Sequence, residues 1–140
     1  MPGFWRVTAI YGLAMGLTDA VMLLLSDLSF RSGAAVFYTL CLVAALALPA
    51  LVAGMGFARH LCRAPGAPEA WRFALWFAAL QGGLMAFLLW LAMQELLAEE
   101  PDGAAILGVI LVGYSAVALL LSRFFFALGA REGMRRSVLR

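Results

Sequence analysis

The sequence predicts an all-α integral membrane protein with four transmembrane helices, and three observations support this fold class. Hydrophobic residues make up 65% of the 140 residues and charged residues only 13%, whereas soluble domains carry about 45–50% apolar and about 25% charged residues. Four apolar stretches each reach the roughly 20 residues that a membrane-spanning helix needs. The connectors between them alternate in charge sign. We therefore expect one domain over residues 1–140, built as an antiparallel up-and-down bundle.

The four transmembrane helices are expected at about residues 4–25, 34–58, 70–93 and 104–128. Each is predicted to be helical because an isolated strand or coil leaves its backbone groups unpaired in lipid. Segments rich in Gly, Pro or Ser separate them at residues 29–33, 64–68 and 101–103. The first stretch is too long for a signal-peptide core and no A-x-A site follows it, so we interpret it as a retained signal-anchor helix.

The charged residues predict the orientation of these helices. Nine of the ten arginines fall on one side of the implied membrane, and five of the eight acids fall on the other. The positive-inside rule then places both termini and the middle connector in the cytoplasm. We expect topology-setting and lipid-headgroup contacts from Arg59, Arg63, Arg72, Arg131, Arg135 and Arg136. The absence of Lys, with the many Ala, Leu and Gly residues, favours a bacterial source and hence the inner membrane.

Asp19 is an acid inside the first apolar stretch, roughly 5 Å from the midpoint of that stretch toward its outer end. A charged side chain in a bilayer costs about 2.5–3.5 kcal/mol on insertion scales, so Asp19 is expected to face protein or water. One interpretation makes it a proton or cation site. The other, which we favour, makes it a packing acid that accepts hydrogen bonds from Thr18, Gln81 or Tyr38.

Two further polar residues lie near the middle of their spans, Gln81 in the third and Ser115 in the fourth, with Tyr114 beside Ser115. Polar groups at one depth can line a small cavity. We favour ordinary interhelical hydrogen bonds, each contributing about 0.6 kcal/mol on average. The candidate intramembrane polar site therefore comprises Asp19, Gln81, Tyr38 and Ser115.

Small residues at helical spacing predict close helix packing. Gly12, Gly16 and Asp19 are spaced i, i+4 and i+7, so they share one stripe of the first helix. The pattern Gly12-x-x-x-Gly16 allows a second helix to approach closely, either within the bundle or in an oligomer. The other helices carry similar pairs, which are Ala50 and Gly54, Ala79 and Gly83, and Ala104 and Gly108.

Residue types that are scarce argue against several classes of enzyme. The single histidine, His60, lies in a connector and excludes a bis-histidine membrane haem site. Cys41 and Cys62 give no CxxC motif and no metal-ligand spacing. No nucleotide-binding fingerprint occurs. We therefore predict no enzymatic activity, no cofactor and no metal, and the net charge of +2 is too small to suggest nucleic acid.

Two resemblances follow from these residues. Four short helices with one acid in the first resemble the small multidrug resistance transporters, which use a membrane-embedded Glu, often in an antiparallel homodimer. Residues 16–20 (Gly-Leu-Thr-Asp-Ala) do not match that family's motif, and the charge bias opposes dual topology. Residues 54–60, 63–65 and 69–72 are similar to a family of uncharacterised four-span bacterial inner-membrane proteins. That resemblance implies no activity and no site residue.

The leading hypothesis is a non-enzymatic inner-membrane protein that acts by helix association, as an accessory subunit or by self-assembly. Its partners would be the lipid bilayer and another membrane protein or a second copy. The alternative hypothesis is a small oligomeric proton-coupled transporter or channel with Asp19 as the coupling site. This alternative requires an oligomer, because four helices alone rarely enclose a pathway.

Overall fold

The computed structural model describes the backbone of residues 3–32 and 35–138, and the side chains of residues 3–25, 35–95 and 97–138. The described chain contains helices and no strand. The helices are α1 (Phe4–Ser32), α2 (Ala35–Leu61), α3 (Ala67–Ala92), α4 (Gln94–Glu99) and α5 (Gly103–Val138). All except the short α4 contain a stretch long and apolar enough to cross a membrane. The predicted all-helical class and the four apolar helices are confirmed.

The helix ends differ from the expected spans for local reasons. In α1, helix continues through Ser32, so most of the break expected at residues 29–33 is helical, and residue 33 itself lies outside the described part. Helix α2 ends at Leu61, because Cys62 adopts a left-handed φ of 50°. Helix α3 begins at Ala67, where the Glu69 carboxylate accepts a hydrogen bond from the Gly66 backbone N–H at 3.0 Å.

Helix α5 continues well past the expected end at residue 128. Its 36 residues correspond to a length of about 54 Å at 1.5 Å per residue, whereas the hydrocarbon core is about 30 Å thick. The last turns are polar and carry Arg135 and Arg136. The helix therefore extends ten residues beyond the expected end of the fourth span, from residue 128 to Val138.

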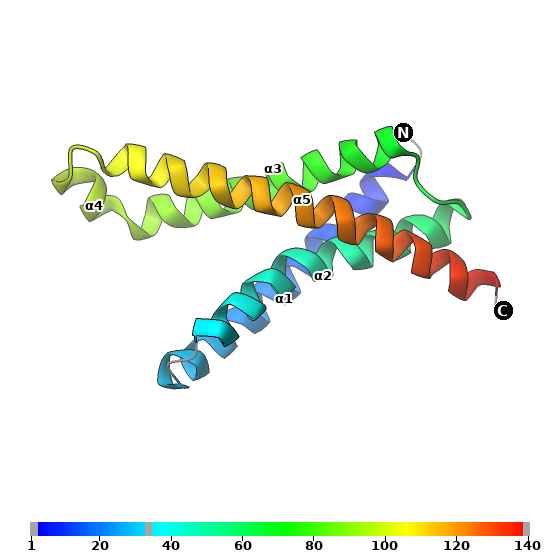
Figure 1. Ribbon diagram of the computed structural model, residues 1–140, viewed down its shortest axis with the longest axis horizontal. Helices are drawn as coiled ribbons and strands as arrows, with labels where there is room; N and C mark the ends of the chain where they lie inside the picture. The colour runs from blue at the N-terminus through cyan, green and yellow to red at the C-terminus, as the bar shows by residue number, and fades with distance from the viewer. Residues whose placement is uncertain (1–2, 33–34, 139–140) are drawn as a thin grey trace.

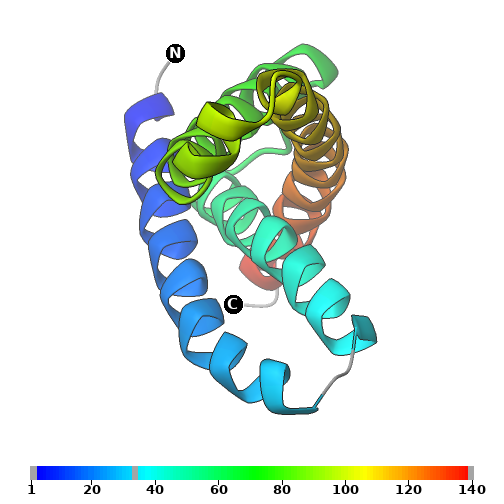
Figure 2. The same ribbon diagram turned by 90° about the vertical axis from the view of Figure 1, so that its left-hand side faces the viewer.

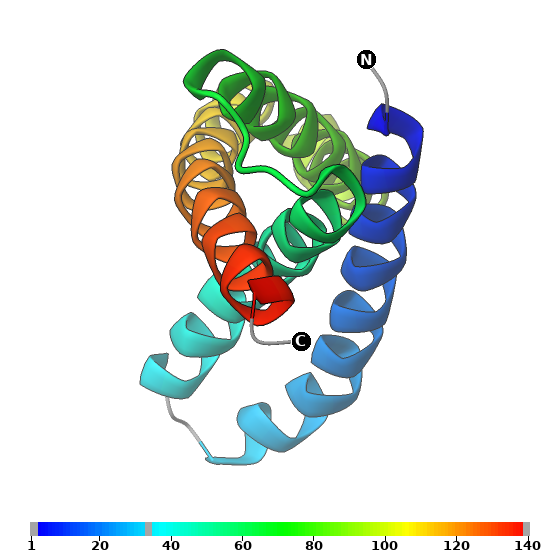
Figure 3. The same cartoon turned by 90° about the vertical axis from the view of Figure 1, so that its right-hand side faces the viewer.

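The four long helices form two hairpins, α1 with α2 and α3 with α5 (Figure 1). The hairpins meet where α2 crosses α5 and diverge from there, so their tips lie far apart (Figures 1 and 2). Figure 3 views the opposite end, where the first turns of α1 and α3 and the last turns of α2 and α5 gather. The helices therefore pack together over only part of their length.

We call these two regions the closed half and the open half. The closed half comprises residues 4–15, 44–61, 67–82 and 114–138. The open half comprises residues 16–32, 35–43, 83–92 and 103–113. Among the described side chains, the buried hydrophobic ones all belong to the closed half.

Aromatic rings fill the centre of the closed half. Tyr11 of α1 stacks on Phe77 of α3 with ring centroids 3.8 Å apart and nearly parallel planes. Phe126 of α5 contacts Phe73 and Phe77 of α3 at 5.0 and 5.7 Å, and Phe57 of α2 at 5.7 Å. Aromatic pairs contribute beyond their buried area. This cluster therefore joins all four long helices at one level.

Glycines allow α2 and α5 to approach at the crossing. A Cβ atom on Gly54 would overlap the backbone of Phe126, and one on Gly129 would overlap the backbone of Leu51. A Cβ on Gly133 would stand 3.0 Å from the Ala58 side chain. Small residues four apart on both helices thus remove the side-chain bulk that would separate them.

Candidate functional site

Asp19 lies on α1 at the start of the open half, where its side chain is half-buried. No described residue donates a hydrogen bond to its carboxylate. Thr18, a donor considered from the sequence, instead donates to the carbonyl of Ala14 at 2.6 Å. The Asp19 carboxylate does lie within electrostatic range of the phenol groups of Tyr11 and Tyr114. Asp19 therefore lies near the polar groups where the two hairpins meet, without a hydrogen bond from a described residue.

Gln81 is buried where the hairpins meet, with 2% of its surface exposed. The Tyr114 hydroxyl of α5 donates to its side-chain oxygen at 3.2 Å. The Tyr11 hydroxyl lies beside Gln81 and Ser122, although neither contact reaches hydrogen-bond geometry. Side chains from α1, α3 and α5 thus form a polar cluster of Tyr11, Gln81, Tyr114 and Ser122 within the aromatic core.

The other predicted polar residues are not part of this cluster. Tyr38 lies on α2 in the open half and is 54% exposed. Ser115 lies between α3 and α5, where its hydroxyl oxygen would be 2.7 Å from a Cβ built on Gly82. Of the four residues in the predicted polar site, Gln81 belongs to the cluster, Asp19 lies near it, and Tyr38 and Ser115 lie elsewhere.

Tyr11 and Ser122 were not predicted as site residues, yet both side chains are fully buried. Tyr11 is one residue before Gly12 and lies to one side of the glycine stripe, about a quarter of a turn away. Ser122 precedes Arg123 near the expected end of the fourth span. Their helical positions relative to Val7 and Phe126, which are also buried, carry the signal that was available in the sequence.

The predicted packing glycines fall into two groups. Gly54 lies in the close crossing of α2 and α5, as described above. The other four predicted packing glycines are Gly12, Gly16, Gly83 and Gly108. A Cβ built on any of them would meet no atom within 4 Å apart from its own stretch of helix. They therefore present small-residue surfaces that no described part of the chain covers.

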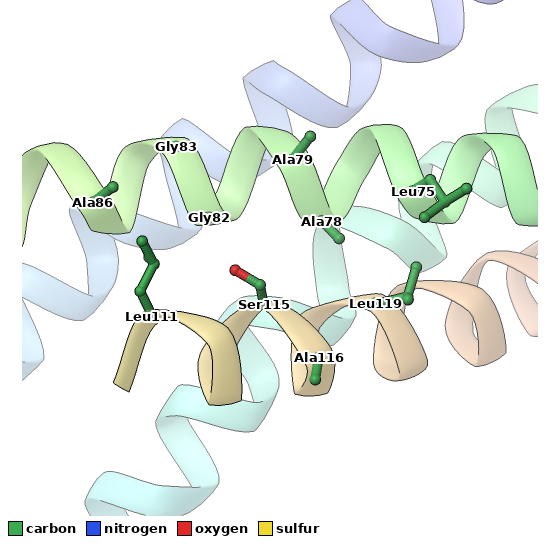
Figure 4. Close-up of a pocket in the computed structure, with 10 residues that line it drawn as sticks. All are labelled: Leu75, Ala78, Ala79, Gly82, Gly83, Ala86, Leu111, Ser115, Ala116 and Leu119. Carbon is green, nitrogen blue, oxygen red and sulfur yellow. The ribbon is translucent and has the colours of Figure 1, made fainter. Parts of the chain in front are cut away.

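A shallow apolar groove of about 470 Å³ runs between α3 and α5. Gly82 and Ser115 face each other across it, and Ala78, Ala86 and Leu111 extend it along the two helices (Figure 4). Among the residues that line it, Ser115 supplies the polar side chain. Such a groove fits an apolar chain or helix face better than a polar solute.

Arginine side chains gather at the end of the closed half where α2 and α5 end. Arg63 makes a two-pronged ion pair with Glu69, with both N···O distances at 2.7 Å. This carboxylate raises the pKa of the Arg63 guanidinium. Arg136 pairs with Glu132 at 2.9 Å, and the Arg123 guanidinium lies 5.5 Å from the centroid of the Trp71 ring. These contacts order part of the arginine-rich surface.

The remaining arginines predicted to contact lipid headgroups are also at this end. All four have exposed side chains: Arg59, Arg72, Arg131 and Arg135. Arg131 and Arg135 flank a second depression of about 410 Å³ together with Glu132. Among the described residues, no three His, Cys, Asp or Glu side chains lie close enough to hold a metal ion.

No protein-family model, curated protein or solved structure matches this chain.

Proposed function

We propose that the protein is a bacterial inner-membrane protein with four up-and-down spans and both termini in the cytoplasm, and that it acts by helix association. In this proposal the open half receives a further transmembrane helix, from a membrane-protein partner or from a second copy. The protein itself carries out no chemical reaction. The arginine-rich closed end faces the cytoplasm, in keeping with the positive-inside rule.

The observation that carries this proposal is the uncovered stripe of Gly12, Gly16 and Asp19. Close packing at small residues favours helix association in lipid, and these two glycines have no helix packed against them. A carboxylate without a hydrogen-bond donor is costly at the same depth. A helix that lies on this stripe and offers a polar side chain to Asp19 would satisfy both requirements at once.

A second function is favoured by a specific feature, the polar groups that follow one another from Asp19 into the closed half. The carboxylate lies within electrostatic range of Tyr114, which donates to Gln81, and Tyr11 lies beside both Gln81 and Ser122. Intramembrane carboxylates mark proton pathways in membrane pumps and transporters, and Asp19 would be the titrating group of this series. The alternative proposal is therefore an oligomeric proton-coupled transporter with Asp19 as the coupling site.

The first experiment is to measure the mass and composition of the intact assembly, purified in mild detergent from its own membrane. A stoichiometric partner or a homo-oligomer supports association, and a monomer that keeps its mass at high protein concentration contradicts it. Gly16→Leu should dissolve the assembly, because the new side chain occupies the contact surface. Leu17→Phe is the matched control, since Leu17 is 70% exposed and lies outside the stripe.

Asp19→Asn separates the two proposals. The substitution keeps the size and hydrogen-bonding capacity of the side chain but removes its ability to carry a proton. Under the association proposal the assembly survives, and proteoliposomes show no proton flux with either chain. If the original protein carries protons and Asp19→Asn abolishes this flux with the assembly intact, the transporter is correct and the association proposal is overturned.

A further inference from the structure

A pocket of about 290 Å³ lies between the beginning of α1 and the end of α2, and its lining combines cationic and apolar residues. Arg6 comes from the first turn of α1, whereas Arg59 and His60 come from the last turn of α2. One turn deeper along each helix lie Ile10 and Gly56, which complete the lining. The pocket is therefore basic toward the helix ends and apolar toward the centre of the molecule.

The shape of this pocket depends on Gly56. A Cβ there would stand 2.7 Å from Cδ1 of Ile10, so the glycine lets the isoleucine side chain lie against α2. The apolar base is thus formed by a close contact between the two helices. This contact fixes the spacing of the basic side chains above it.

A hydrogen bond orders the basic side chains. Arg6 Nη1 lies 3.3 Å from His60 Nδ1. Because a guanidinium can only donate, His60 accepts at Nδ1, and the proton of the neutral ring is on Nε2. The pocket therefore presents two guanidinium groups as donors, with the His60 ring held beside them.

Glu69 and Glu132 form ion pairs with arginines that do not line this pocket. Glu69 is held by Arg63 at 2.7 Å, and Glu132 is held by Arg136 at 2.9 Å. Among the described residues, no carboxylate pairs with Arg6 or Arg59. The positive charge of the pocket is left for a ligand from outside the chain.

We infer that this pocket binds a phosphate group, supplied by the headgroup of an anionic phospholipid. Guanidinium groups bind phosphate oxygens through paired, charge-assisted hydrogen bonds. The apolar base of Ile10 and Gly56 suits the lipid part that follows the phosphate. Trp5, which is 77% exposed beside Arg6, is the residue type found at the membrane–water boundary. The site requires only that the chain lies in a bilayer, and not that it associates with another helix.

The test is native mass spectrometry of the full chain in mild detergent, titrated with phosphatidylglycerol and, separately, with zwitterionic phosphatidylcholine. We expect one tightly bound phosphatidylglycerol and no comparable phosphatidylcholine. Arg59→Gln and Arg6→Gln should each weaken this binding about tenfold, because a hydrogen bond to a charged group is lost. Thermal unfolding without added lipid should be unchanged, since both side chains are exposed.

Arg72→Gln is the matched control, because Arg72 is an exposed arginine at the same end that does not line the pocket. It removes the same charge and should leave tight binding intact. Equal weakening by all three substitutions would show a general surface-charge effect and overturn the site. Equal binding of phosphatidylcholine would also overturn it. Displacement of the lipid by an equal concentration of inorganic phosphate would make the ligand free phosphate and overturn the lipid assignment.

Discussion

The closed half and the open half are built from the same four long apolar helices, yet among the described side chains only the closed half forms a hydrophobic core. In the closed half, Gly54 and Gly129 bring α2 and α5 into backbone contact, and aromatic rings occupy the centre. In the open half, Gly16, Gly83 and Gly108 have no neighbour. In lipid, hydrophobicity does not drive helices together, so close-fitting surfaces decide where they pack. The comparison shows that a small-residue pattern closes a contact only where the facing helix supplies a matching surface.

The largest expected effect is the loss of a core ring. Phe126→Ala removes a fully buried side chain that touches Phe57, Phe73 and Phe77. It should lower the free energy of unfolding by about 3–5 kcal/mol, as large-to-small core substitutions do. Phe87→Ala in the open half, where the ring is 55% exposed, should change it far less. Denaturant unfolding in mixed micelles measures both, and equal losses would mean that the two halves are equally packed.

Next comes the crossing of α2 and α5. Gly129→Ala places a Cβ against the backbone of Leu51, which cannot move aside as a side chain can. We expect a loss of about 1–3 kcal/mol from overpacking. Gly83→Ala is the control, because its Cβ would enter open space. If the two alanine variants unfold at the same denaturant concentration, the close approach of the helices is wrong.

Gly16→Leu should have a smaller effect on the stability of the fold. Under the association proposal, its main consequence is that the assembly dissociates. The new side chain enters space that is empty within the chain, so the free energy of unfolding of the isolated protein should change by less than about 0.5 kcal/mol. The intact assembly should dissociate over the same range of protein concentrations in which the original chain remains assembled. Analytical ultracentrifugation in density-matched detergent measures this. A variant that is clearly less stable but remains assembled would contradict this prediction, because Gly16 would then support the fold and not the association.

The smallest effect concerns the ion pair of Arg63 and Glu69 at the start of α3. Glu69→Gln weakens this contact and the hydrogen bond from the Gly66 backbone N–H. Because Arg63 is exposed, solvent and salt screen the pair. We expect a small decrease in melting temperature that shrinks as sodium chloride is raised. Glu132→Gln, at the other exposed pair, should behave alike, and a large salt-independent decrease would contradict this account.

The sequence was sufficient to predict the helical class and the approximate spans, because long apolar stretches with polar breaks allow few alternatives. It did not predict where the helices pack. Many large hydrophobic side chains are exposed as well as buried, so Gly12 and Gly54 look alike in the sequence although only Gly54 lies in a close contact. The topology across the membrane remains a prediction from the arginine distribution.

The partner surface of Gly54 was missed for a related reason. Gly129 and Gly133 form a G-x-x-x-G pattern, but they follow Leu128, the expected end of the fourth span. The helix continues through them because helical backbone does not require apolar residues. The polar cluster was only partly predicted, since Tyr11 of the first hairpin reaches Gln81 and Ser122 of the second only where the two hairpins meet.

The uninterrupted course of α5 has a mechanical consequence. A single straight helix joins the groove beside Ser115 to the arginines at the far end of the chain, and it rests on α2 at Gly54 and Gly129. The same helix also packs against α3 through Phe126, so it is held on two sides near its middle. A displacement of the basic end of α5 would therefore be carried along one continuous helix to the groove beside Ser115.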